Sequence, residues 1–154
     1  MALADLVAQN AVMPALKVNN KKQAIQELSA RAAELTGQSE RAILEILQQR
    51  EKLGSTAVGN GVAIPHGKLP TLGRLFGLFA RLARPIDFEA LDGQPVDLIF
   101  LLLAPEAAGA DHLKALARVA RLLRDPDIAR KLRESDNADA LYAVLAMPAV
   151  AGAA

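Results

Sequence analysis

The chain has 154 residues, a length that fits one domain with a substantial core. Lysine and arginine total 18 and aspartate and glutamate total 17, so no strong net charge would attract nucleic acid or an anionic membrane surface. The absence of cysteine excludes disulfides and thiolate chemistry and favours a cytoplasmic location. The N-terminus lacks the positive segment of a signal peptide, and the longest purely apolar run, 98–105, is far shorter than the roughly 20 residues that cross a membrane.

The first part of the chain predicts one strand and two helices. Residues 11–18 read as an edge strand, because Pro14 cannot donate to a neighbouring strand. Apolar residues at helical spacing predict a helix over 19–35 that stops at Gly37. Ser39 is expected to cap a second helix over 40–50.

The middle of the chain predicts most of a sheet. Glycine-rich residues 54–67 read as a strand, a loop and a second strand that leads to His66. Residues 73–88 alternate imperfectly, as a half-buried strand does, and residues 91–95 form a turn signal. The continuous apolar run within 96–105 is typical of a strand that is buried on both faces.

Three helices are expected to follow, over 109–125, 126–132 and 137–145, and residues 149–154 are expected to fray. Pro126 suits the first position of its helix. The apolar face of the first of these helices is predicted to carry Leu113, Leu116, Ala120 and Leu123. Helices alternating with strands indicate a layered α/β domain.

His66 has two unusual neighbours. Pro65 fixes its own φ and has no amide proton, whereas Gly67 has no Cβ and leaves room beside the ring. Together they predict an imidazole held at a strand end with free space next to it. The alternative is an ordinary core or surface histidine among turn residues, which composition alone favours equally.

Polar groups before His66 could surround an anion. Ser55 and Thr56 offer hydroxyl donors, and the segment Gly59, Asn60 and Gly61 suits a tight turn with exposed amides. Arg50 ends the preceding helix and could reach a phosphoryl group. It could equally be a C-terminal partner for the dipole of its own helix.

His112 is the second histidine of the chain. Asp111 is a plausible N-cap, which would put His112 in the first turn of its helix, where free amides and the helix dipole favour an anion. The same field is expected to lower the pKa of the imidazole. A solvated side chain with no function is the alternative.

The residues required for several common kinds of active site are absent from the sequence. A zinc site needs three or four ligands, and this chain has two histidines and no cysteine. A nucleophile elbow of the GxSxG type is absent, and residues 59–68 have the wrong spacing for a phosphate-binding Walker loop. What remains is a histidine that is itself the nucleophile and accepts a phosphoryl group, with no metal or other cofactor.

Two segments, REKLGSTAVGNGVAIPHGKLP (50–70) and PIDFEALDGQPVDLIFLLLAPEAAGADHLKALARVARLLRDP (85–126), resemble the mannitol/fructose-type IIA family of the bacterial phosphotransferase system, in its nitrogen-related branch. The similarity runs from about Leu16 to Leu132. It implies one IIA type-2 domain over residues 1–154 with a core of about 12–147. It also implies a three-layer α/β/α sandwich around a small mixed sheet.

The resemblance further implies site roles and partners. His66 is expected to accept a phosphoryl group on Nε2 from an HPr-like carrier, with His112 orienting or stabilising it and Arg50 beside it at the site. The phosphorylated and unphosphorylated forms are expected to bind different targets, such as potassium-transport proteins or sensor kinases. Two alternatives stay open: a sugar-specific IIA component that passes phosphate to a IIB domain, and a binding module without phosphotransfer.

Overall fold

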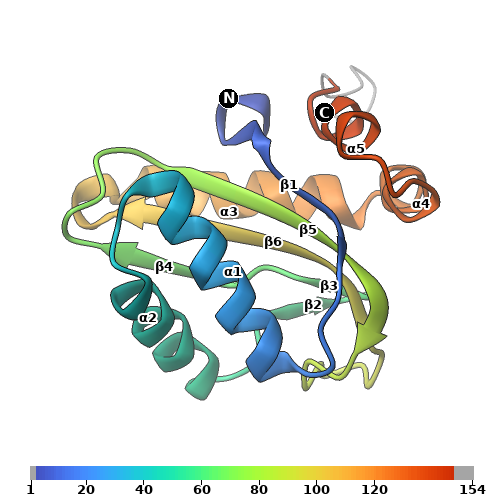
Figure 1. Ribbon diagram of the computed structural model, residues 1–154, viewed down its shortest axis with the longest axis horizontal. Helices are drawn as coiled ribbons and strands as arrows, with labels where there is room; N and C mark the ends of the chain where they lie inside the picture. The colour runs from blue at the N-terminus through green and yellow to red at the C-terminus, as the bar shows by residue number, and fades with distance from the viewer. Residues whose placement is uncertain (1–2, 148–154) are drawn as a thin grey trace.

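The computed structural model describes residues 3–147, so the fraying expected over 149–154 lies outside the described residues. Within them a six-stranded mixed sheet has the order β1-β5-β6-β3-β2, and β4 also pairs with β6. Helices α1 and α2 cover one face, α3 lies on the other, and α4 and α5 continue from α3 to the edge strand β1 (Figure 1). The predicted three-layer α/β/α sandwich is confirmed.

The elements have the following bounds. The strands are β1 (Val7–Leu16), β2 (Ala57–Gly59), β3 (Val62–Ala63), β4 (His66–Leu69), β5 (Phe76–Ile86) and β6 (Val96–Pro105). The helices are α1 (Lys21–Thr36), α2 (Glu40–Lys52), α3 (Ala110–Arg124), α4 (Pro126–Glu134) and α5 (Ala138–Leu145). Short 3-10 turns cover Leu3–Asp5 and Glu106–Ala108.

Strand β1 is an edge strand, as Pro14 predicted, and among the described residues it pairs with β5 alone, in parallel. It begins at Val7, four residues earlier than expected, because Val7 also contributes a buried side chain to the core. On α1 and α2 the predicted caps are present. Gly37 ends α1 with a φ of 73°, and the side chain of Ser39 accepts a hydrogen bond from the amide of Ala42.

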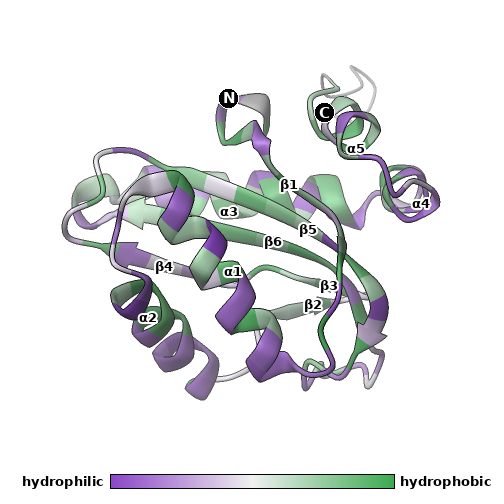
Figure 2. Cartoon of the chain, in the orientation of Figure 1, coloured by the Kyte–Doolittle hydropathy of each residue, from purple (hydrophilic) through white to green (hydrophobic). Residues whose placement is uncertain are grey.

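Strands β5 and β6 form the centre of the sheet, where hydrophobic residues dominate (Figure 2). Strand β6 is buried on both faces, as predicted. The expectation of a half-buried strand over 73–88 is wrong for the middle of β5, where Leu78, Phe79 and Ala80 are all fully buried. The reason is topological: β5 lies between β1 and β6, and the sheet has α1 on one side and α3 on the other (Figure 1).

Strands β3 and β4 lie one after the other along the same edge of β6. Val62 pairs with Leu98 and His66 pairs with Leu102, so the two pairs are offset by four positions on both strands and the register is unbroken. The ladder is interrupted at Ile64 and Pro65. The amide of Ile64 turns to the carbonyl of Thr56, and Pro65, which has no amide proton, only accepts a bond from Leu102.

Helix α3 begins differently from the prediction. The residue before its first turn is Gly109, with a φ of 55°, and no side chain caps the helix, so Asp111 is not the N-cap. His112 does lie in the first turn, but it faces inward with Ala115, Val119 and Leu123. The buried face therefore includes His112 in place of Leu113, which is 68% exposed.

Helix α4 begins at Pro126, as expected, and the Asp125 side chain accepts bonds from the amides of Asp127 and Ile128. Between residues 3 and 147, no helix combines the length and the apolar character that a membrane span needs.

Candidate functional site

His66 is the first residue of β4, and its ring is held by its own backbone. The Nδ1 atom lies 2.8 Å from the carbonyl oxygen of Ile64. Because a carbonyl oxygen can only accept a hydrogen bond, we assign the ring proton to Nδ1. In the neutral imidazole the Nε2 atom then keeps a free lone pair, which makes it the nucleophilic atom of the ring.

The surroundings of His66 favour the neutral ring. Burial lowers the pKa of His66 below its ordinary value, because the imidazolium loses hydration. The bond to Ile64 raises this pKa, the charge of Arg50 lowers it, and the carboxylate of Glu51 raises it. The net direction is downward, so the ring is mainly neutral at pH 7, the state that a nucleophile requires.

His112 lies beside His66, as predicted. The two ring centroids are 5.7 Å apart and the ring planes meet at 68°. His112 is 6% exposed, and its Nε2 atom has no hydrogen-bond partner among the described residues. Burial, followed by the charges of His66 and Lys68, lowers the pKa of His112. A buried nitrogen without a partner is costly, and a group attached to His66 could satisfy it.

Arg50, Ser55, Thr56 and His66 line one hollow of about 220 Å³. Its remaining lining is apolar: Ala57, Val58, Ile64, Leu116 and Ala120. A water molecule takes about 30 Å³ of the liquid, so the hollow has room for a tetrahedral oxyanion. We call it the His66 hollow. The structure thus brings together four residues that the sequence singled out.

Arg50 lies in the last turn of α2, and its Nη1 atom donates to the carbonyl oxygen of Gly54 at 2.8 Å. This bond holds the guanidinium just beyond the helix end, where it lines the His66 hollow. Both sequence readings therefore apply, because Arg50 lies at the negative end of its own helix and also faces the site.

The hydroxyl groups of Ser55 and Thr56 already have acceptors. Ser55 Oγ donates to the carbonyl oxygen of Phe88 at 2.6 Å, and Thr56 donates its amide and its hydroxyl to the carboxylate of Glu51. The expectation that these hydroxyls are free to donate to an anion is wrong. In the hollow, positive charge comes from Arg50.

The turn formed by Gly59, Asn60 and Gly61 lies elsewhere, and its predicted place at the site is wrong. The β6 partners of Val62 and His66 are four positions apart, which at 3.3 Å per residue is a distance of about 13 Å. The turn precedes Val62 and is therefore farther still from His66. The Asn60 amide donates to the carboxylate of Asp92 and the Asn60 carbonyl accepts from Arg133. An amide that is bound to a carboxylate is not available to a phosphoryl group.

Gly67 is required by packing against α2 and does not provide space for a ligand. A Cβ at this position would lie 2.2 Å from Cγ2 of Ile46. The absence of a side chain lets β4 approach the helix that carries Arg50. The prediction that Gly67 leaves free room beside the ring is therefore corrected.

Glu51 and Lys21 also lie near the site, and no sequence motif indicates them. The Lys21 Nζ atom lies 3.0 Å from Glu51 Oε1, and the Glu51 side chain is 8% exposed. Charged residues at the ends of surface helices are usually solvated, so no periodicity or motif indicated that these two form a largely buried pair. Among residues 3–147 the structure contains no group of three or more side chains that could hold a metal ion.

Comparison with known proteins identifies the family. The family described as "Phosphoenolpyruvate-dependent sugar phosphotransferase system, EIIA 2" matches residues 5–147. The chain belongs to this family. The resemblance seen in the sequence is therefore confirmed, over a longer stretch than the expected Leu16 to Leu132.

Individual relatives agree with this assignment. A nitrogen regulatory protein of Bradyrhizobium diazoefficiens is 75% identical, with 96% of this chain and 97% of the relative covered. A nitrogen regulatory protein of Escherichia coli is 39% identical, with 94% and 90% covered. The crystal structure of the nitrogen regulatory protein IIA-Ntr from Neisseria meningitidis has a TM-score of 0.88 at 34% identity, covering 93% of this chain and 98% of that one.

Mannitol-type IIA proteins share the fold. The crystal structure of IIA mannitol from Escherichia coli has a TM-score of 0.74 at 20% identity, with 90% of this chain and 97% of that chain covered. The structure of a complex between IIA mannitol and phosphorylated IIB mannitol, from the same organism, has a TM-score of 0.76.

Proposed function

We propose that the protein is a phosphoryl-accepting regulatory component of a nitrogen-related phosphotransferase system. His66 Nε2 would take a phosphoryl group from the phosphohistidine of an HPr-like carrier. The observation that carries this proposal is the bond between Nδ1 and Ile64, which leaves the Nε2 lone pair free on a ring that lines an anion-sized hollow. The EIIA 2 family and the nitrogen regulatory relatives support it.

In the proposed transfer, one phosphorus–nitrogen bond forms as another breaks, so the step requires no cofactor. The lone pair of Nε2 forms a bond to phosphorus while the phosphorus–nitrogen bond of the donor breaks, and that electron pair stays on the imidazole of the donor. The His66 ring gains positive charge, which the Nδ1–H donor shares with the Ile64 carbonyl. Such a transfer depends mainly on positioning and charge stabilisation.

The attached group would bring a charge of about −1.5 to −2 near neutral pH, by analogy with other phosphorylated side chains. Arg50 is the cation that lines the hollow. Two unit charges about 4 Å apart near a protein surface interact by about 4 kcal/mol before desolvation. His112 Nε2, which lacks a partner among the described residues, is the second group that would stabilise the product.

The nitrogen regulatory relatives support a regulatory output. Because several are nitrogen regulatory proteins, we propose that the phosphorylation state of His66 controls binding to targets in nitrogen metabolism or potassium homeostasis, such as potassium-transport proteins or sensor kinases. Phosphate transfer to a IIB domain is the alternative, and the mannitol-type complex with IIB motivates testing it. The proposed location is the cytoplasm, where an HPr-like carrier would meet the protein.

The test is labelling by a phosphorylated HPr-like carrier. We expect one acid-labile phosphoryl group on the wild type and none on His66→Ala, with both proteins melting cooperatively. A His66→Ala variant that is labelled like the wild type would remove His66 from the proposal. An unlabelled wild type would indicate a binding module without phosphotransfer. Loss of label after addition of a sugar-type IIB domain would indicate the sugar-specific alternative.

A further inference from the structure

Glu51 directly follows Arg50 at the end of α2, but it does not line the His66 hollow. Its carboxylate instead binds Thr56, which with Ser55 forms a polar wall of the hollow. Its Oε1 atom accepts the amide of Thr56 at 3.1 Å, and its Oε2 atom accepts the Thr56 hydroxyl. Thr56 is buried and lines the hollow. One carboxylate therefore fixes both the backbone and the side chain of a wall residue.

Lys21, the first residue of α1, holds Glu51 in turn. Its Nζ atom lies 3.0 Å from Glu51 Oε1, 3.4 Å from Glu89 and 4.8 Å from the centroid of the Phe88 ring. The carbonyl oxygen of Phe88 accepts the hydroxyl of Ser55, the wall residue next to Thr56. Ser55 and Thr56 thus donate their hydroxyl groups to Phe88 and Glu51, two of the residues that Lys21 contacts.

We propose that Glu51, held by Lys21, is a positioning residue for phosphoryl transfer: it sets the Ser55–Thr56 wall of the His66 hollow beside Arg50. This inference rests on the proposed function. Glu51 does not line the hollow and would not touch the phosphoryl group. It would act through Thr56, and through the backbone that places Arg50 one residue earlier on α2.

The pairing also explains why a carboxylate is tolerated so near an anion site. A buried negative charge without a partner would be costly and would repel a phosphoryl group. Lys21 neutralises it. Arg50, which donates to the neutral carbonyl oxygen of Gly54, then supplies the positive charge that faces the hollow.

The titration of His66 gives an independent readout of this arrangement. The charged and titratable groups near the two rings are Arg50 and Glu51 from α2, His112 from α3, and Lys68 from β4. Of these, Glu51 raises the pKa of His66. A structural role far from the site would not affect this pKa.

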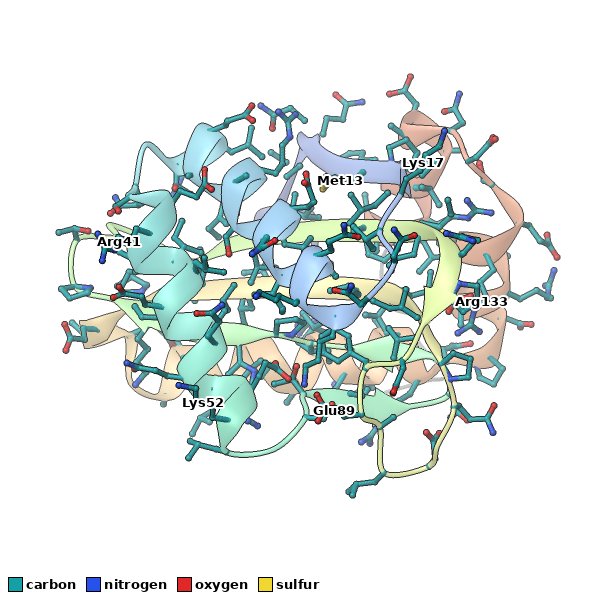
Figure 3. All side chains as sticks on the ribbon, turned by 60° about the horizontal axis from the view of Figure 1, so that its bottom comes forward. Met13, Lys17, Arg41, Lys52, Glu89 and Arg133 are labelled. Carbon is teal, nitrogen blue, oxygen red and sulfur yellow. The ribbon has the colours of Figure 1, made fainter. Side chains whose placement is uncertain are left out.

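The experiment compares Glu51→Gln with Asp97→Asn as a matched control. Asp97 forms a partly buried ion pair with Arg133 beside the β2–β3 turn, at the other end of β3 from His66. In Figure 3, Arg133 lies on the opposite side of the view from Lys52, the last residue of α2. For Glu51→Gln we expect a lower His66 pKa in an NMR titration and transfer from the phosphorylated carrier slowed by about 10-fold or more. Asp97→Asn should change neither quantity.

A second variant keeps the test decisive if Glu51→Gln does not fold. Lys21→Met combined with Glu51→Gln removes both charges together, so no uncompensated charge is buried, and it should show the same slow transfer. Transfer at the wild-type rate with an unchanged His66 titration, in either folded variant, would overturn the inference. If the wild type accepts no phosphoryl group, the proposed function fails, while the NMR titration still decides whether Glu51 acts on His66.

Discussion

Replacing Gly67 with alanine tests the contact that brings β4 against α2. The new Cβ would lie 2.2 Å from Cγ2 of Ile46, and the next nearest atom would be Ile46 Cβ at 3.6 Å. The clash is therefore with one methyl group. That methyl cannot rotate away at low cost, because a β-branched side chain in a helix strongly prefers one χ1 rotamer.

The expected magnitude follows from two opposing effects. Overpacking a core contact costs about 1–3 kcal/mol of unfolding free energy. Gly67 has no positive φ, so alanine also restricts the unfolded chain and returns about 0.4–1 kcal/mol. A net loss of about 1–2 kcal/mol lowers the melting temperature of a domain of this size by about 2–8 °C.

A double-mutant cycle with Ile46→Ala measures the contact directly. Ile46→Ala removes the clashing methyl, so Gly67→Ala should be harmless or stabilising in that background. Gly73→Ala is the control, because a Cβ at Gly73 meets nothing within 4 Å. The assay is thermal and urea unfolding, together with the labelling rate of His66. If Gly67→Ala costs the same with and without Ile46, the packing argument is refuted.

Three further predictions concern the charged and titratable groups of the site. Arg50→Ala should slow labelling by about 100-fold in a stopped-flow or quench assay while the protein still melts cooperatively, and an unchanged rate would remove Arg50 from the site. His112→Leu should slow labelling but leave the melting temperature equal or higher, because it removes a buried nitrogen without a partner. The folded pKa values of His66 and His112 lie below the ordinary 6.5, so the unfolded chain binds more protons and stability should fall as the pH drops below about 6.5. Melts from about pH 7.5 to 5 should show a smaller loss for His112→Leu than for the wild type, and equal losses would contradict this sign.

The sequence predicted those features of the fold that depend on local patterns. Pro14 indicated an edge strand, Ser39 a helix start, and the apolar run within 96–105 a strand buried on both faces, and all three are confirmed. The inward face of α3 was mispredicted because hydrophobicity alone favoured Leu113 over His112. A histidine that faces the core beside a second histidine has no periodic signature.

The site was predictable where its residues share a motif and unpredictable where tertiary contacts decide. The family resemblance implied that Arg50, His66 and His112 lie together, and in the structure Arg50 and His66 line one hollow while His112 lies beside His66. The sequence could not show that the hydroxyl groups of Ser55 and Thr56 donate to Phe88 and Glu51, because those contacts depend on how separate elements pack. Residues 59–61 are close to His66 in the sequence but not in space, because each residue of an extended strand adds about 3.3 Å of length.

The shared register of β3 and β4 along β6 has a mechanical consequence. A reactive side chain on a flexible loop must be ordered whenever a donor arrives, and ordering costs conformational entropy. His66 begins a strand that is paired with β6, and its ring is tethered to its own main chain, so that cost is met when the protein folds. An arriving donor therefore meets a His66 ring that is already oriented. The rate of phosphoryl transfer should then depend on how well the two protein surfaces fit.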